Sequence, residues 1–403
     1  MTPVATRSDE APLRVGWRVA LAVFALAGLT GAVFRGIVAS GTTLRLDLTN
    51  VRHAHSHLMY FGWATPALFA LVAHRLPGLG GAPIARPGRL LVATFALALA
   101  AFPPFLLVGY GVVAVGPARL PLPMMLAGAN VLAWYAFVAL YVRARRDAPP
   151  PGARALLDAA VALLVLATLG AWGLPVLQIA GDGTHVALQS ALTHLFLDAF
   201  SEGWFVLGVL ALAAAEARAD GRAVSDRVLR ASAVAVALGV PFTFALAMPP
   251  ALVPPTFAAL ARVGSGLVGA GLLTSVAALW RGAAPGWRVA LALLALKAAA
   301  QVAVGTWPAL AGVAGVRVLY LHAMLLGFVT LGLAAAARGA FGRAAVPGHA
   351  ALVGTVGVLL ASLVLLTPAG AALAPGGRAT AVALAVGALG PPLVAAWMAA
   401  RAR

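Results

Sequence analysis

The chain has 403 residues, of which 62% are hydrophobic and only 10% are charged, and it contains no cysteine. These values exclude a soluble globular protein, since apolar runs recur along the whole chain. They also exclude disulfide, iron–sulfur and thiolate sites. The net charge of +17 is carried by arginines between the apolar runs, so it indicates membrane topology and not nucleic-acid binding.

Twelve apolar runs follow one another along the chain. A run of about 20 residues is long enough for a helix to cross a bilayer. The runs are continuous and rich in Leu, Ala, Val and Gly, which favours helices over the alternating strands of a barrel. The predicted spans are 15–39, 52–74, 88–113, 119–142, 155–180, 185–214, 228–250, 256–280, 287–309, 316–338, 347–368 and 378–400. We therefore predict an all-α polytopic transmembrane bundle, with residues 1–403 forming a single membrane domain and no convincing internal repeat.

Arginine-rich breaks alternate with arginine-poor breaks between the spans. The positive-inside rule then places both termini in the cytoplasm and predicts a multi-pass protein of the cytoplasmic (inner) membrane. The first 14 residues lack a cleavage pattern, so we expect the first span to remain as an anchor. Spans two, six and ten run from outside to inside, and their histidines fall at a similar depth in the outer half of the bilayer.

The start of span two carries three histidines in five residues, in a chain with only eight. On a helix His53 and His57 share one face, whereas His55 and Met59 share another. Arg52 precedes them. An interfacial cluster bonded to lipid headgroups is the plain alternative, but this density favours a cofactor or metal site.

Span six carries His194, Asp198 and Glu202 on one face, each one turn from the next. This spacing suits a metal ligand beside a proton-accepting carboxylate. A structural pairing of the carboxylates with Lys297 or an arginine is the competing interpretation. Lys297 is the only lysine and lies in span nine, one turn from Gln301, which indicates a polar track or an internal ion pair.

Span ten carries Arg317, Tyr320 and His322. A single histidine in a helix is more often a packing residue than a ligand. The depth of His322 matches that of the span-two histidines, which favours a ligand role. Arg317 and, in span eight, Arg262 have the charge to neutralise an anionic cofactor group near the outer surface.

These residues resemble the catalytic subunit I of heme-copper oxidases and the large subunit of nitric oxide reductases. In span two that family has a heme-ligating histidine followed by methionine four residues on and proline eleven residues on, and His55, Met59 and Pro66 fit this pattern. In span ten, His322 and Gly327 fit the second histidine of the family's His-x-His segment and the glycine that follows it. The resemblance covers three helices and the span count.

The resemblance continues in span six and fails in span seven. His194 and Asp198 look like the reductase segment in which a histidine binds the non-heme metal beside a carboxylate. Tyr320 stands where the family has its high-spin heme ligand. The His-His pair of span seven is absent around Pro241–Phe244, so we expect no complete binuclear centre.

The resemblance implies one low-spin heme, of b type, between spans two and ten. His322 is one axial ligand and His55 is the preferred partner, with His57 as the alternative. Near this heme the candidate cofactor-binding residues also include Met59 and Tyr320. The candidate partners of the heme propionates are Arg52, Arg262 and Arg317.

A second metal, copper or non-heme iron, has His194, His53 and Asp198 as its candidate ligands. Asp198 and Glu202 are the candidate catalytic residues, acting on protons. The implied function is nitric oxide or respiratory electron-transfer chemistry, with nitric oxide or a periplasmic electron donor as partner. Oxidoreductase turnover and a sensor role both stay open, because the binuclear centre is incomplete.

Two further interpretations remain. The His-Ala-His segment and the late His-Ala segment are also similar to the NnrS family of nitric-oxide-response membrane proteins. From a different class, a transporter or metal-handling permease would use the intramembrane His, Asp and Glu residues to bind a translocated cation or proton.

Overall fold

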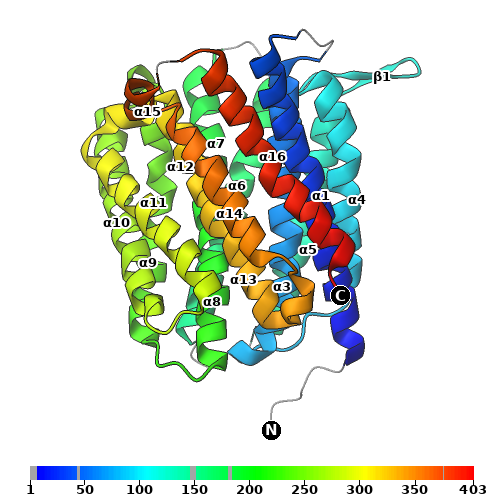
Figure 1. Cartoon of the computed structure of the whole chain (residues 1–403), viewed down its shortest axis with the longest axis vertical. Coiled ribbons are helices and arrows are strands. Elements are labelled where there is room, and N and C mark those ends of the chain that lie inside the picture. The colour runs from blue at the N-terminus through cyan, green and yellow to red at the C-terminus, as the bar shows by residue number, and fades with distance from the viewer. Residues whose placement is uncertain (1–6, 43–45, 146–150, 180–183, 375) are drawn as a thin grey trace. The chain divides into compact units, whose positions relative to one another are not determined.

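The computed structural model describes residues 7–42, 46–145, 151–179, 184–374 and 376–403. Helices account for nearly all of these residues (Figure 1). Ten helices in these ranges are long and apolar enough to cross a membrane. The chain is therefore an all-α multi-pass membrane protein, as its composition predicts.

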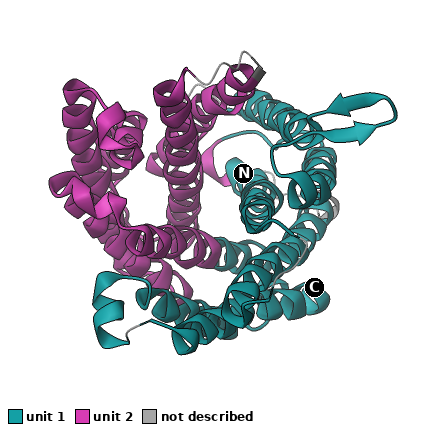
Figure 2. Ribbon diagram, turned by 90° about the horizontal axis from the view of Figure 1, so that it is seen from above, with its two compact units in different colours: residues 1–77, 81–146, 333–403 teal, residues 78–80, 147–332 magenta. Residues whose placement is uncertain are grey.

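The chain divides into two compact units (Figure 2). Unit 1 comprises residues 1–77, 81–146 and 333–403, and unit 2 comprises residues 78–80 and 147–332. The elements of unit 1 are α1 (Arg7–Ser40), α2 (Leu48–His57), η1 (Leu58–Ala64), α3 (Thr65–Arg75), α4 (Pro87–Val108), β1 (Val113–Val115), β2 (Ala118–Leu120), α5 (Leu122–Ala144), most of α13 (Leu331–Phe341), η7 (Arg343–Ala345), α14 (His349–Val364), α15 (Pro368–Leu373) and α16 (Arg378–Arg401). The elements of unit 2 are α6 (Gly152–Ile179), α7 (Val186–Asp198), η3 (Ala199–Leu207), α8 (Gly208–Ala219), α9 (Asp226–Ala247), η4 (Pro250–Leu252), α10 (Pro255–Trp280), α11 (Pro285–Thr306), η5 (Pro308–Gly312), α12 (Ala314–His322) and η6 (Ala323–Thr330). The short η2 (Leu76–Leu79) has residues in both units.

In unit 1, α1 packs along α16 and against the consecutive elements α2, η1 and α3. Aromatic side chains fix this contact. The Trp63 ring of η1 stacks on Phe24 of α1, with ring centroids 4.9 Å apart, and lies 5.6 Å from the Trp17 ring. All three side chains are buried. The packing holds one face of the histidine-rich helix α2 against α1.

In unit 2, α9, α10 and α11 pack in sequence order, and α6 packs against α7, η3 and α9. The segment η6 contacts both α11 and η3. Gly203 of η3 and Gly327 of η6 permit close packing, because a Cβ at either position would meet Leu163 or Leu293. Spans six and ten, far apart in sequence, therefore lie side by side within this unit.

Two of the twelve predicted spans are not among these ten helices. The span predicted at 52–74 corresponds to residues 48–75, which are helical throughout but change from α to π and back to α. The span predicted at 347–368 corresponds to α14, a helix of 16 residues. This helix is shorter than the length expected for crossing a bilayer perpendicularly.

The boundary between the third and fourth predicted spans is wrong. The predicted spans are 88–113 and 119–142, but α4 ends at Val108 and α5 begins at Leu122. The residues between them form an antiparallel hairpin in which Val113 pairs with Leu120. A short apolar, β-branched strand has the same hydropathy as the end of a spanning helix, so hydropathy alone assigned these residues to the spans.

Candidate functional site

The three helices predicted to carry the site share an unusual backbone feature. Each changes from α-helix to π-helix directly after a candidate residue: η1 follows His57, η3 follows Asp198 and η6 follows His322. A π-helical turn contains an extra residue and is frequent at functional sites. The backbone thus marks the same three helices that the polar residues indicate.

The three π-helical segments also share a sequence pattern. In each segment the fifth residue is a glycine, and an aromatic residue follows it. The glycine–aromatic pairs are Gly62–Trp63, Gly203–Trp204 and Gly327–Phe328. This short pattern thus recurs in spans two, six and ten.

His55 faces α1 in unit 1. Its Nδ1 lies 2.7 Å from the carbonyl oxygen of Ala27. A carbonyl oxygen can only accept, so Nδ1 carries the hydrogen and the neutral ring has its lone pair on Nε2. Gly31 lies against the ring, where a Cβ would come within 2.8 Å of the imidazole. Arg35, also on α1, is within electrostatic reach of His55.

His53 and His57 lie on the other face of the helix, as their spacing predicts. The His53 ring meets the edge of Tyr110, with centroids 4.9 Å apart. The His57 ring stacks on Phe61 at 4.0 Å and lies 4.4 Å from Phe105. The Nε2 atom of His57 is buried and has no hydrogen-bond partner among the described residues.

His322 is the last residue of α12 in unit 2. Its Nδ1 lies 2.8 Å from the carbonyl oxygen of Val318, one turn earlier. The same reasoning as for His55 places the hydrogen on Nδ1 and the lone pair on Nε2. An imidazole oriented by a hydrogen bond from its second nitrogen to a main-chain carbonyl is the usual arrangement of a metal-ligating histidine.

A buried ion pair lies at the centre of the polar residues of unit 2. Lys297 Nζ is 3.0 Å from Glu202 Oε1, and the two side chains are 0% and 5% exposed. Tyr320 donates its hydroxyl hydrogen to Glu202 Oε1 across 2.7 Å, and the same hydroxyl contacts the side-chain oxygen of Gln301. The interpretation of Lys297 as a partner in an internal ion pair is thus confirmed.

The surroundings of this ion pair explain why it is tolerated. Burying a charge away from water is costly unless an opposite charge and further hydrogen bonds compensate. Glu202 receives both from Lys297 and Tyr320, and the Lys297 ammonium also lies 5.4 Å from the centre of the Tyr320 ring. The backbone of Gln301 is held in turn by Ser265, whose hydroxyl donates to its carbonyl oxygen at 2.7 Å.

His194 and Asp198 have separate partners. An Arg317 nitrogen lies 3.2 Å from His194 Nδ1, and Thr243 donates to Asp198 Oδ2 at 2.8 Å. Arginine can only donate, so Nδ1 of His194 accepts and the hydrogen of the neutral ring is on Nε2. In this arrangement His194 presents no lone pair to a metal ion.

The predicted metal ligands are not assembled into a cluster. Within the described ranges, no three His, Asp or Glu side chains come close enough together to hold a metal ion. His53 contacts Tyr110, His194 contacts Arg317 and Asp198 contacts Thr243. The geometry therefore gives no support to a second metal on His53, His194 and Asp198.

The remaining candidate residues differ in exposure. Arg52 and Arg262 are exposed, whereas Met59 is half-buried within η1. Arg317 is half-buried beside His194, and Tyr320 is committed to Glu202. The exposed side chains of Arg52 and Arg262 can meet an anionic group, whereas Tyr320 is held in the polar cluster.

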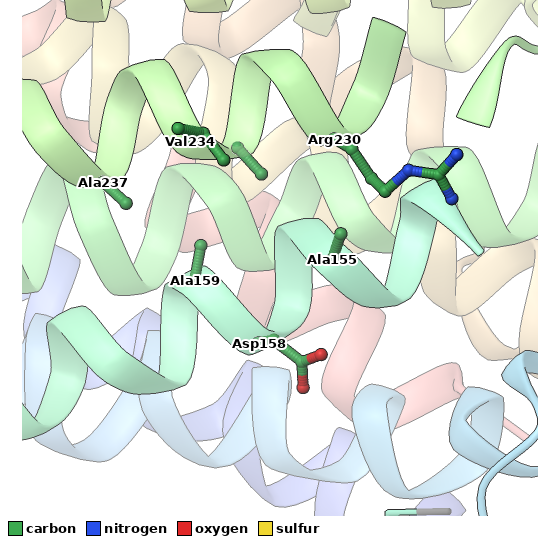
Figure 3. Close-up of a pocket in the computed structure, with 7 residues that line it drawn as sticks. Ala155, Asp158, Ala159, Arg230, Val234 and Ala237 are labelled. Atoms are coloured by element: carbon green, nitrogen blue, oxygen red, sulfur yellow. The ribbon is translucent and has the colours of Figure 1, made fainter. Parts of the chain in front are cut away.

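A surface pocket of unit 2 lies apart from these residues. It has a volume of about 240 Å³ and lies between α6 and α9 (Figure 3). Asp158 and Arg230 are its only charged lining residues, and the others are alanine or valine. It contains no histidine, so we do not include it in the candidate site.

Neither a protein-family model nor a curated protein matches this chain. Its candidate site is therefore defined by its own residues. Sequence reasoning missed Ala27, Arg35 and Thr243, which contact or influence His55 and Asp198. A main-chain acceptor such as Ala27 leaves no trace in the residue type. Thr243, however, is a polar residue in a predicted span and was open to detection.

Proposed function

We propose that this chain is a membrane hemoprotein that binds one low-spin b-type heme through His55 and His322. The observation that carries this proposal is the orientation of the two imidazoles. Each ring donates Nδ1–H to a main-chain carbonyl, so Nε2 is the unprotonated nitrogen of the neutral imidazole, and the two rings belong to different units. Their pairing on one iron follows from the sequence pattern of spans two and ten.

Neutral imidazole is a good ligand for heme iron, and the donor set fits this group. The hydrogen bond to a carbonyl fixes each ring and raises the basicity of its ligating nitrogen. His57 is the alternative to His55, since its buried Nε2 also lacks a protein partner among the described residues. The Cys-free chain offers no thiolate to compete with either.

A bound heme supplies a one-electron redox couple. The resemblance to oxidase and nitric oxide reductase subunits points to nitric oxide or respiratory electron transfer as its use, with a periplasmic electron donor as a candidate partner. In this account Arg52, Arg262 and Arg317 offset the charge of the propionates. Asp198 and Glu202 do not bind the heme and instead hold or transfer protons.

We also propose twelve spans with both termini in the cytoplasm, in the inner membrane. The alternation of arginine-rich and arginine-poor breaks supports this topology. Reporter fusions near residues 148 and 183 should report opposite sides of the membrane. If both report the cytoplasm, the span count is wrong, and the common depth of the histidines is lost with it.

The visible absorption spectrum of the detergent-purified, heme-replete protein tests the main proposal. We expect split reduced bands and a shift of the main band between the oxidised and reduced forms. A pyridine hemochrome assay on the same sample gives the heme type and the heme-to-protein ratio, which we expect to be one. Absence of heme absorption in a folded sample would refute the proposal.

The second candidate is a transporter that moves a proton or cation through unit 2. The observation in its favour is the buried network of Glu202, Lys297, Tyr320 and Gln301, contributed by η3, α11 and α12. Such intramembrane charges often mark ion or proton pathways. A heme-free protein that acidifies or alkalises the lumen of proteoliposomes, and loses this activity on Glu202→Gln, would establish this function instead.

A further inference from the structure

A basic cavity lies at one end of unit 1, and none of the candidate heme residues lines it. It has a volume of about 670 Å³ and is lined by residues of α1, of η7 and the turn after it, and of the last turns of α16 with the residues that follow. Three of its eight lining residues are arginines, Arg18, Arg401 and Arg403, and none is acidic. The cavity therefore concentrates positive side-chain charge, and no acidic side chain lines it.

The three arginines lack carboxylate partners. In the described part of the chain, no salt bridge includes any of them. Arg401 instead lies over the Trp397 ring, with the guanidinium carbon 5.3 Å from the ring centre. Guanidinium groups gathered in a concave site without acidic side chains are suited to bind an anion that presents two oxygens to the paired N–H donors, as phosphate does.

The cavity walls are held in place by main-chain hydrogen bonds and packing. The backbone nitrogen of Arg403 donates to the carbonyl oxygen of Ala344 at 3.1 Å. The adjacent carbonyl, of Ala345, accepts from the buried indole nitrogen of Trp17 at 2.9 Å. Gly348 has φ of +67° and lies directly against the Trp397 ring, where a side chain would collide. The arginines thus project from a fixed frame.

The remaining wall of the cavity is apolar, with alanines, Pro347 and Trp397. Trp397 is 42% exposed. Arg18 lies near the start of the first predicted span and Arg401 in the last turn of α16, which places the cavity where apolar helices leave the hydrocarbon. Tryptophan is enriched at this level, and basic pockets between membrane helices bind anionic lipid headgroups.

We propose that this cavity binds the phosphodiester headgroup of an anionic phospholipid. The arginines bind the phosphate, and Trp397 and the apolar wall contact the glycerol and upper acyl region. A free phosphate ion would use only the arginines. The mixed lining therefore favours the lipid as the source of the phosphate.

Lipid-dependent thermal stability tests this proposal, since a ligand that binds only the folded state raises the melting temperature. Phosphatidylglycerol, phosphatidylcholine or inorganic phosphate is added to the full chain in a neutral detergent. The first should raise the melting temperature in a saturable way, whereas the other two should not. An equal rise with phosphatidylcholine, an equal rise with inorganic phosphate, or no rise at all would overturn the proposal.

A triple variant, Arg18→Gln, Arg401→Gln and Arg403→Gln, locates the effect. Its half-saturating phosphatidylglycerol concentration should rise about tenfold or more, because several charge-assisted hydrogen bonds are lost. A control triple removes equal charge from exposed arginines outside the cavity, by Arg89→Gln, Arg227→Gln and Arg281→Gln. Equal weakening in both triples would show general electrostatic attraction and refute a specific site.

Single substitutions cover the case in which the cavity triple does not fold. Arg401→Lys keeps the charge but loses the planar pair of donors, and Arg18→Gln removes one charge at the opposite wall. Each should weaken the response to phosphatidylglycerol severalfold relative to Arg89→Gln. Responses equal to that of Arg89→Gln for both would refute the assignment of the phosphate to these side chains.

Discussion

Helix α2 of unit 1 and helix α7 of unit 2 carry polar residues at the same spacing but in different surroundings. His53 and His57 of α2 are followed by the same π-helical pattern as His194 and Asp198 of α7. In unit 1 the neighbouring side chains are aromatic, whereas in unit 2 they include Arg317 and other polar groups. The sequence spacing is therefore shared, and the neighbouring helices determine the chemistry.

The comparison extends to the tautomers of the histidines. His55 and His322 each face a carbonyl acceptor, so that Nε2 carries the lone pair. His194 faces a guanidinium donor, so that its lone pair is already used at Nδ1. Histidines predicted to lie at the same depth in the membrane are therefore not equivalent. What matters is whether the nearest polar atom donates or accepts.

The largest effect should come from His322→Ala. This substitution removes one proposed axial ligand, so we expect complete loss of the low-spin heme spectrum in protein that remains folded by circular dichroism. His194→Ala is the matched control, because it removes a histidine of similar burial whose lone pair points to Arg317, and it should keep the spectrum. A normal low-spin heme in the His322 variant would refute the assignment of His322 as an axial ligand.

Replacing His55 and His57 separately should sharpen the comparison between the two faces of span two. We expect His55→Ala to abolish the low-spin spectrum and His57→Ala to preserve it, since only the ring of His55 is oriented by a main-chain carbonyl. The measurement is the reduced-minus-oxidised difference spectrum of each purified variant. The reverse result would transfer the ligand role to His57, and retention in both would remove span two from the site.

The buried ion pair of unit 2 should give the next largest effect, on stability. Glu202→Gln or Lys297→Met alone leaves an uncompensated buried group and should cost about 3–5 kcal/mol. The double variant removes both charges and should recover much of that loss. Unfolding in mixed detergent micelles measures all three free energies, and additive losses in the double variant would show that the two side chains do not stabilise each other.

Much of the fold was predictable from the sequence, because hydropathy and helix length are both set by the bilayer. The spans of α9, α10 and α16 agree with the structure to within a few residues. The hairpin from Val113 to Leu120 was not predictable this way, since its apolar residues continue the hydropathy of α4. The π-helical segments were also missed, because no residue type encodes them by itself.

The candidate site was predictable in its residue types but not in its pairings. The spacing of Lys297 and Gln301 put both on one face of α11, yet either carboxylate of span six was a possible partner for the lysine. The structure pairs Lys297 with Glu202 and leaves Asp198 to Thr243. That choice depends on how α9 and α11 pack around η3, which a single sequence does not report.

The smallest effects should follow substitutions at Asp198. Asp198→Asn keeps an oxygen that can accept from Thr243, so the heme spectrum should be unchanged and the stability nearly so. Thr243→Val removes the donor and should cost about 1 kcal/mol, the net value of one hydrogen bond. Any turnover or proton uptake should fall in Asp198→Asn. Loss of heme from that variant would show that the cofactor is misplaced in this account.

Near-infrared magnetic circular dichroism of the oxidised protein tests the central claim most directly, because its charge-transfer band reports both axial ligands of a low-spin heme. The two carbonyl-oriented imidazoles predict a bis-histidine band that disappears in His55→Ala and in His322→Ala but persists in His194→Ala. A histidine–methionine band or a high-spin spectrum in the parent protein would contradict ligation by His55 and His322.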